Sequence, residues 1–362
     1  MAQANRSLVY RGVAYDTGSN HETGQGSISR TVWSNEIMRR EIDAVRDELN
    51  ANSVTIYGTR FDRLRETVEA AVSRGLHVWL QPRLMDGTQE QVLEHLQEAA
   101  KLAESFRTRG ADIRLTVGSV HSVQTHGIMP GEHYHNRMGN VFAHADHHFL
   151  RPAGPVDQED VTTKLNAFLR RAAKVARDHF GGEITYSAGP FEEVDWSLFD
   201  YIGLTYYYFY HPTREGYVQE LDAYRRWNKP IVIAEYGTFT YKDAHTKGLL
   251  GFDIVDRSED PPTVFDGFVR DEQAQADFHT GMLRMFDEIG IHSVAVTEFI
   301  HPTHPHSSDP KYDLDAASMA ITKCIRDDYW DHDSTYRFEP KESLRAIGRY
   351  YADVAARERD AA

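Results

Sequence analysis

Short apolar runs and amphipathic stretches alternate along the whole chain. Each apolar run is bounded by turn-forming residues, which is typical of a strand. In the segments between them apolar residues recur at helical spacing, as in 35–51, where Met38, Ile42 and Val45 fall on one stripe. The strand-like runs are 8–16, 52–58, 77–84, 112–120, 183–189, 201–209, 230–237 and 292–300.

This alternation predicts an α/β fold, a closed (β/α)8 TIM barrel, because each strand is followed by a helix that can cover it. A capping box at Thr88 to Gln91 and a C′ glycine at Gly75 support the helix boundaries. The alternative is an open doubly wound sheet, but no G-x-G-x-x-G loop follows an early strand. No Pro/Ser-rich linker divides the chain, so residues 1–362 are predicted to form one domain.

Two long irregular segments interrupt the rhythm, 121–160 after the fourth strand and 301–340 after the eighth. Both follow the carboxyl end of a strand, and barrel enzymes keep their sites at that face. We therefore expect these segments to cover a site.

Composition narrows the classes of partner. The 362 residues carry 40 Lys and Arg against 55 Asp and Glu, a formal net charge of −15, which argues against nucleic acid because phosphate binding needs clustered cations. A single cysteine, Cys324, excludes an intramolecular disulfide framework and a multi-cysteine metal site. No apolar run is long enough to span a membrane. We expect a cytoplasmic protein that binds a small molecule; the sequence leaves its oligomeric state open.

Glu235 ends the apolar strand Ile231–Ala234, where a strand buried on both faces must meet solvent. At the carboxyl end of a barrel strand such a carboxylate is a candidate catalytic group. The alternative is structural, an ion pair with an arginine such as Arg83 that ties the rim together.

Three segments resemble the clan A glycoside hydrolases, the retaining barrel glycosidases. "NKPIVIAEYGT" is similar to the seventh strand of that clan, "ANSVTIYGT" to the second and "FDYIGLTYYYF" to the sixth. The resemblance implies a glycoside hydrolase-like enzyme that acts on a small glycoside or sugar-like ligand. It also implies that Glu235 is the nucleophile.

The chain departs from that clan at two points. The clan carries an Asn-Glu pair at the end of strand four, with the glutamate as acid/base, whereas Ser119, Val120 and His121 stand here. Thr55 occupies the likely position of an arginine usual near the end of strand two, although Arg60 follows. Retaining hydrolysis needs two carboxyl groups about 5–5.5 Å apart. The proton donor must therefore come from elsewhere.

Glu298, near the end of the eighth strand, is a candidate donor, because a neighbouring carboxylate would raise the pKa of one of the pair. The alternative is that Glu298 binds a substrate hydroxyl or a rim arginine. His121 is a second candidate, since imidazole titrates near neutral pH. Glu192 and Glu193 lie in a segment that looks like an exposed loop and rank lower.

Histidines crowd the two long segments, and imidazole with carboxylate is also a ligand set for zinc, iron or manganese. Their spacings match no metal motif, so we expect no metal and no cofactor. The histidines are His121, His126, His133, His135, His144, His147, His148, His301, His304 and His306.

Aromatic residues near the strand ends are expected to line the substrate pocket, although strand alternation allows only about half of them to face it. The predicted substrate-binding residues are Asp16, Tyr57, Trp79, Tyr206, Tyr207, Tyr208, Tyr236 and His301. Asp16 could instead cap its own loop as an Asx-turn. Two functions remain open: a retaining glycosidase, or a diverged barrel that performs other His/Glu or metal-assisted chemistry or only binds a ligand.

Overall fold

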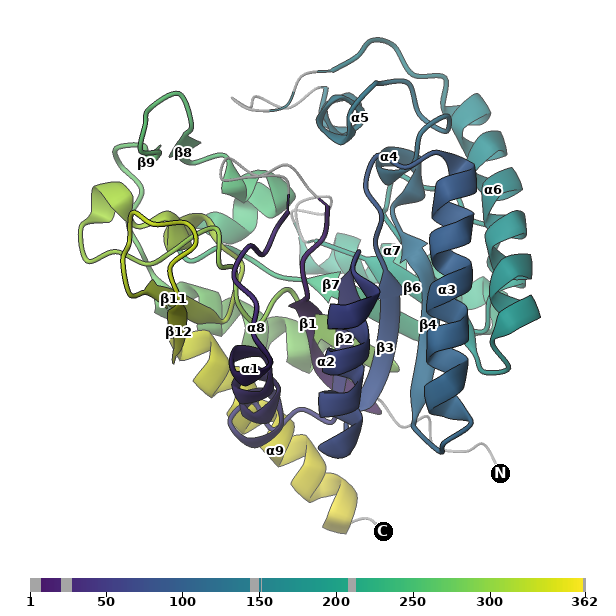
Figure 1. The fold of residues 1–362 in the computed structure, drawn as a ribbon, viewed down its shortest axis with the longest axis horizontal. Coiled ribbons are helices and arrows are strands. Elements are labelled where there is room, and N and C mark those ends of the chain that lie inside the picture. The colour runs from purple at the N-terminus through teal and green to yellow at the C-terminus, as the bar shows by residue number, and fades with distance from the viewer. Residues whose placement is uncertain (1–7, 21–27, 144–149, 151, 208–212, 361–362) are drawn as a thin grey trace.

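The computed structural model describes residues 8–20, 28–143, 150, 152–207 and 213–360. Eight parallel strands close into a barrel in the order β1-β10-β7-β6-β5-β4-β3-β2, which confirms the predicted (β/α)8 fold (Figure 1). Each predicted run contains one of these strands. They are β1 (Tyr10–Asp16), β2 (Ser53–Gly58), β3 (His77–Pro82), β4 (Ile113–Ser119), β5 (Ile184–Ala188), β6 (Ile202–Thr205), β7 (Ile231–Tyr236) and β10 (Ser293–Val296).

Helices cover the outside of the barrel. Ser34 caps the first of them, and the capping box predicted at Thr88 and Gln91 is formed. Helices α3 and α6 pack side by side, as do α8 and α9. The long helices are α1 (Asn35–Asp47), α2 (Phe61–Ser73), α3 (Gln89–Arg107), α6 (Gln158–His179), α7 (Arg214–Tyr224), α8 (Glu272–Glu288) and α9 (Glu342–Asp360).

The repeat is less regular than the sequence suggests. Between β5 and β6 the chain forms only the short 3-10 helix η1 (Trp196–Leu198), so the fifth repeat lacks its α-helix. A third long excursion, 237–271 after β7, was not predicted; it holds the 3-10 helix η4 (Ala244–Phe252) and the hairpin of β8 (Val255–Asp256) and β9 (Thr263–Val264).

The two predicted long segments also carry structure. The first holds α4 (His121–Gln124) and α5 (Tyr134–Val141), and the second holds η5 (Pro310–Tyr312), η6 (Leu314–Ala317) and a hairpin of β11 (Thr322–Arg326) and β12 (Tyr336–Pro340). Figure 1 shows α4, α5 and the β8–β9 hairpin along the upper side of the molecule.

Side chains pack the barrel interior at its lower end, where the strands begin. Trp79 meets Tyr10 and Tyr201 edge to face there, with ring centroids 6.3 Å and 5.3 Å apart. Close strand contact needs glycine at two points: a Cβ on Gly12 would lie 2.6 Å from the Ser53 carbonyl oxygen, and one on Gly203 would lie 2.3 Å from that of Tyr186. Aromatic side chains therefore fill the lower end of the barrel interior.

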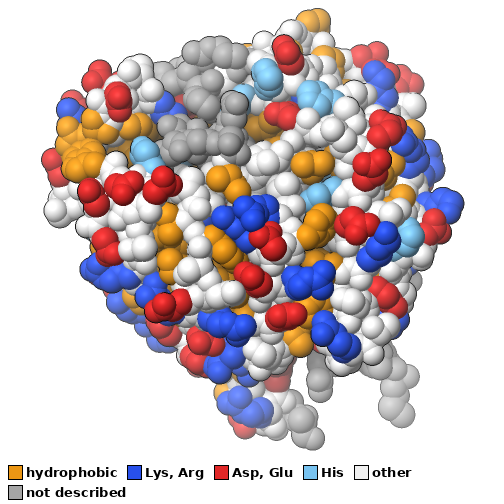
Figure 2. Space-filling model, viewed as in Figure 1, with side chains coloured by type: hydrophobic (Ala, Val, Ile, Leu, Met, Phe, Trp, Pro, Cys, Tyr) orange, Lys and Arg blue, Asp and Glu red, His pale blue; other side chains and the backbone are white. Residues whose placement is uncertain are grey.

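Acidic and basic side chains are interspersed over the face seen in Figure 2, with no broad field of one sign among the coloured residues. Such a surface lacks the clustered cations that hold a polyanion. Among the residues that the structure describes, none of the helices combines the length and the apolar character that a membrane crossing requires.

A buried ion pair joins the loop after β1 to α1. The Arg30 guanidinium contacts Glu41, with side chains 1% and 0% exposed, and also the hydroxyl of Tyr336 in β12. A second Arg30 nitrogen donates to the carbonyl oxygen of Asp16 at 2.9 Å. Glu41 accepts a further hydrogen bond from Tyr15. The cluster therefore fixes the end of β1 against the 301–340 segment.

Glu41→Gln is expected to destabilise the fold strongly, because it leaves the Arg30 charge without a counter-charge where water is excluded. Removing one partner of a buried pair costs about 3–5 kcal/mol of unfolding free energy. Denaturant unfolding measures the loss. The matched control is Glu288→Gln, which breaks an exposed pair with Arg214 and should change little. Equal losses in the two variants would contradict this account.

Candidate active site

Glu235 lies at the carboxyl end of β7, paired in register with Thr205 of β6. Its Oε1 accepts a hydrogen bond from an Arg83 Nη at 2.6 Å, and its Oε2 accepts one from the Tyr207 hydroxyl at 3.4 Å. The Glu235 side chain is 12% exposed. The structural alternative, a pair with Arg83, is thus present, and it occurs at the mouth of the barrel.

Arg83 follows β3 and lies between several of the mouth's side chains. Its guanidinium carbon is 3.9 Å from the centre of the Tyr57 ring, a cation–π contact. Burial opposes its charge, but Glu235, Tyr57 and Asp16 raise the pKa of Arg83 above its ordinary value. A permanent positive charge therefore sits beside the Glu235 carboxylate.

Glu298 and His301 form a second charged pair. Nδ1 of His301 contacts Oε1 of Glu298, and the Tyr57 hydroxyl donates to Oε2 at 2.7 Å. Burial would raise the pKa of Glu298, but His301, Tyr57 and Arg83 hold it below its ordinary value. The shift is opposite to the one expected of a carboxylic general acid, so the Glu298 carboxyl is ionised.

Two adjacent cavities open at the mouth. The larger, about 310 Å³, has Glu298 and His301 in its wall, and the smaller, about 100 Å³, has Glu235. We call the larger cavity the dyad lobe, after the Glu298–His301 pair, and the smaller one the Glu235 lobe. The two predicted carboxylates therefore line neighbouring lobes. The residues that line both lobes are Arg83, Tyr134, Met138, Tyr207 and Leu249.

The two lobes differ in chemistry. The Glu235 lobe is walled partly by the polar side chains of Ser119, Gln124 and Thr205. The dyad lobe is walled mainly by apolar groups, including Phe239, Leu249, Phe252, Ala317 and Met319. Polar walls suit a hydroxyl-rich ring, whereas apolar walls suit an apolar substituent.

Strand alternation turns several predicted pocket residues away from the mouth. Tyr206 packs edge to face on Tyr217 of α7, with ring centroids 4.6 Å apart, and Tyr236 packs on Phe286 of α8 at 5.1 Å. Trp79 lies in the lower barrel described above. None of these three lines either lobe. Tyr208 lies outside the described residues, as do His144, His147 and His148.

His121 is also placed away from the lobes. Its ring is stacked on Tyr186 at 5.5 Å, and its nitrogens lie 2.9 Å from the Thr125 hydroxyl and 3.1 Å from the Val117 carbonyl oxygen. Burial lowers the pKa of His121 to about 4. The ring is therefore neutral and fixes the turn after β4.

Ser119 and Val120, which replace the Asn-Glu pair of the clan, line the Glu235 lobe. Val120 has φ 35° and ψ 51°, a left-handed conformation that a β-branched residue rarely adopts. No carboxylate from the described part of the segment after β4 lines either lobe.

Asp16 and Glu192 hold loops together and line neither lobe. Asp16 accepts hydrogen bonds from the Gly18 amide at 2.8 Å and from the Ser29 hydroxyl, and burial together with the Glu298 charge raises its pKa. Glu192 was expected to be exposed, but it is buried: it accepts from the Ser122 and Gly189 amides at 2.9 Å and 3.1 Å. The Glu192 carboxylate thereby joins the turn after β4 to the turn after β5, while Glu193 is exposed.

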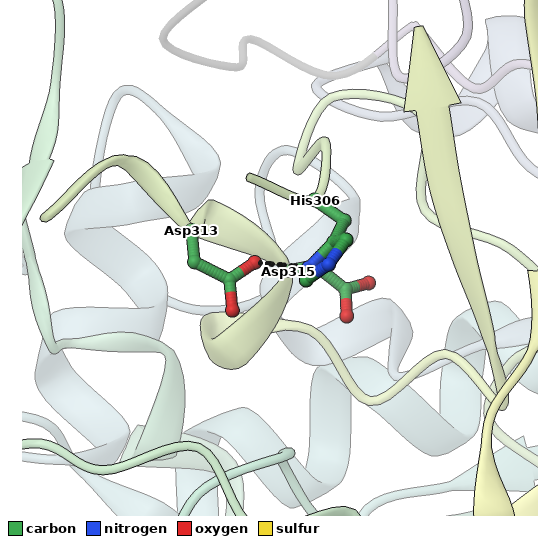
Figure 3. Close-up of side chains that lie close together, drawn as sticks. All are labelled: His306, Asp313 and Asp315. Atoms are coloured by element: carbon green, nitrogen blue, oxygen red, sulfur yellow. Dashed lines mark hydrogen bonds and ion pairs between the residues drawn. The ribbon is translucent and has the colours of Figure 1, made fainter. Parts of the chain in front are cut away.

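One cluster has the composition of a metal site. His306, Asp313 and Asp315 bring ligand atoms within 4.8 Å of one another (Figure 3). Arg270 pairs with Asp313 at 3.0 Å and with Asp315 at 2.9 Å, and Lys341 pairs with Asp315 at 2.8 Å. These two cations already balance the two carboxylates, so the cluster is explained as the ionic core of the 301–340 segment.

Several residues of the lobes were not predicted. They come from excursions whose backbone no periodicity places: Ser29, Tyr134, Phe239, Leu249, Phe252, Arg257, His304 and Met319. His304 was considered only as part of a histidine-rich segment, and its ring meets that of His301 edge to face at 4.4 Å.

Comparison with known proteins finds solved structures that share this fold. No protein-family model and no curated protein sequence matches this chain. Solved structures do match. A GH113 β-1,4-mannanase complex superposes with a TM-score of 0.58 at 13% identity, over 95% of this chain and 99% of that one.

Two further matches point the same way. A GH113 β-mannanase from Alicyclobacillus acidocaldarius, in complex with ManMIm, gives a TM-score of 0.57 at 15% identity, over 97% and 100% of the chains. A family 1 β-glucosidase from Thermotoga maritima gives 0.53 at 12%, over 97% and 99%. At these identities the likeness concerns the fold: the chain shares the closed (β/α)8 architecture of these enzymes.

Proposed function

We propose that this protein is a glycoside hydrolase-like enzyme that acts on a small glycoside or sugar-like ligand, with Glu235 as the nucleophile. The observation that carries the proposal is the setting of Glu235: a strand-end carboxylate, oriented by Arg83 and Tyr207, in a partly polar lobe at the mouth of the barrel. The solved structures with the same fold include enzymes described as a mannanase and glucosidases, which supports a sugar as the substrate class.

The contacts of Glu235 suit a nucleophile. The Arg83 charge is complementary to the Glu235 carboxylate, and hydrogen bonds from Arg83 and Tyr207 orient that carboxylate. In the reaction an oxygen of Glu235 attacks the anomeric carbon as the glycosidic bond breaks, and water later cleaves the resulting ester. Tyr207 and Arg83 can also reach the ring hydroxyls, since both line the same lobe.

Glu235→Gln should nearly abolish turnover while the fold and ligand affinity are kept. The amide preserves the shape of the side chain but has no charge with which to form the ester, and loss of a nucleophile costs roughly 10⁴-fold or more in kcat. Steady-state kinetics on aryl glycosides measures the loss, and thermal melting checks the fold.

Glu183→Gln is the matched control for that variant. Glu183 pairs with Arg114 at 2.9 Å, at the opposite end of the barrel from the lobes. Its substitution should leave kcat unchanged. Full activity of Glu235→Gln on the substrate of the parent enzyme would reject Glu235 as nucleophile.

A second function is favoured by one observation, the lack of a carboxylate at the end of β4 among the described residues. A diverged barrel that only binds a ligand, or that uses histidine chemistry, would need no such group. The two functions predict different effects on turnover when His121 is substituted.

His121→Asn should lower stability and leave turnover within about threefold of the parent. The ring is neutral and bonded to Val117 and Thr125, so its loss removes buried hydrogen bonds worth about 1–3 kcal/mol but no proton donor. Melting and steady-state kinetics on one preparation separate the two effects. A loss of turnover as large as that of Glu235→Gln would favour the second function.

A further inference from the structure

We propose that His301, positioned by Glu298, is the acid/base group of this enzyme, and that the group it protonates is an apolar leaving group held in the dyad lobe. This inference rests on the proposed function, because it supplies the proton donor that glycoside cleavage requires. It assigns His301 a catalytic role and makes Glu298 a positioning residue.

The hydrogen bonds set the orientation of the pair. Oε1 of Glu298 takes the Nδ1 proton of His301, and Oε2 takes the hydroxyl proton of Tyr57. Nε2 is then the nitrogen of His301 left to act on a ligand. Both residues line the dyad lobe, and the His301 side chain is the more accessible of the two, 33% exposed against 9% for Glu298.

The charges around His301 favour its protonated form. Burial opposes protonation, but Glu298 raises the pKa of His301, and the carboxylates of Asp16 and Asp315 act in the same direction. The cationic neighbours of His301 in the lobe are Arg83 and Arg257. The pKa of His304 lies well below its ordinary value because of burial and the His301 charge. His304 is therefore neutral, and His301 carries the proton.

The position of His301 suits proton transfer to the departing side of a substrate. Glu235 and His301 lie in different lobes that share Arg83 and Tyr207 as common wall. A sugar ring in the Glu235 lobe would extend its aglycone into the dyad lobe. The walls there, which include Phe239, Phe252 and Met319, favour an aryl or alkyl aglycone over a second sugar.

The proton balance is complete without a further reactant. As Glu235 bonds to the anomeric carbon, the glycosidic carbon–oxygen bond breaks and the departing oxygen takes the Nε2 proton of His301. Neutral His301 then removes a proton from water as that water attacks the anomeric carbon. The ester to Glu235 breaks, which restores the Glu235 carboxylate and the His301 imidazolium.

The test uses leaving groups that differ in their need for a proton. Two aryl glycosides of one sugar are compared, a dinitrophenyl glycoside, which departs without protonation, and a phenyl glycoside, which does not. We expect His301→Gln to lower kcat/KM for the phenyl glycoside by roughly 10²–10⁴-fold and to leave that for the dinitrophenyl glycoside within about tenfold.

His306→Gln is the matched control. His306 belongs to the same segment and also pairs with a carboxylate, Asp313 at 2.8 Å, but it lines neither lobe. It should show no selective loss on the phenyl glycoside. Equal losses on both substrates in His301→Gln would mean that His301 is structural and would overturn the assignment.

Glu298→Gln tests the positioning role through pH. Activity that needs protonated His301 is present at low pH and is lost as pH rises through its raised pKa, so the alkaline limb of kcat/KM should lie above the ordinary value of about 6.5. Loss of the Glu298 charge should move that limb to lower pH and keep the phenyl reaction faster than in His301→Gln. An unmoved limb would overturn the role of Glu298.

Ring NMR of the resting enzyme decides the matter independently of any substrate. The His301 signal, assigned from its absence in His301→Gln, should titrate above 6.5 in the parent and lower in Glu298→Gln. Titration of His301 below 6.5 in the parent would overturn the proposal. Failure of the proposed function gives a different result, a Glu235→Gln variant that is as active as the parent.

Discussion

The positive charge of Arg83 is the constraint on which the mouth of the barrel depends. Three carboxylates, Asp16, Glu235 and Glu298, end up at one face because parallel strands bring their carboxyl ends together. Like charges in a site of low dielectric repel unless cations stand among them. Arg83 bonds Glu235 and covers the ring of Tyr57, whose hydroxyl in turn bonds Glu298. The second cation, His301, pairs directly with Glu298.

This division of charge separates two tasks. Glu235 is paired with a group that cannot lose its proton, which suits the proposed nucleophile. The Glu298 carboxylate instead stabilises a group that can lose one, as an acid/base requires. The proposed mechanism needs no carboxylate at the end of β4 for proton transfer, and Val120, where the turn after β4 begins, lines the pocket.

The fold was predictable because the strands of a barrel are recognisable in the sequence as short apolar runs. The position of Glu235 followed because it ends one of these runs. The orientation of individual side chains was harder. Tyr206 and Tyr207 are neighbours in sequence, yet one faces α7 and the other the pocket, and the sequence does not state which. The predicted α-helix between β5 and β6 was wrong, because the segment there is long enough to hold a short helix but forms only η1.

The pairing of His301 with Glu298 could not be read from the sequence, because it depends on how the chain turns after β10 rather than on a periodic pattern. The same holds for the apolar wall supplied by the excursion after β7, because no periodic pattern places Phe239, Leu249 and Phe252 beside a cavity. Arg83 was foreseen as a possible partner of Glu235, but its contact with Tyr57 needs the geometry of β2 beside β3.

The central claim, covalent catalysis by Glu235, is tested most directly by trapping the intermediate. A 2-deoxy-2-fluoro glycoside with a dinitrophenolate leaving group forms the ester without a proton donor, while the fluorine slows its hydrolysis. The account predicts that mass spectrometry finds one fluoroglycosyl group per chain, on the peptide that contains Glu235. An adduct on another residue, or turnover of the parent glycoside with no adduct at any time, would contradict it.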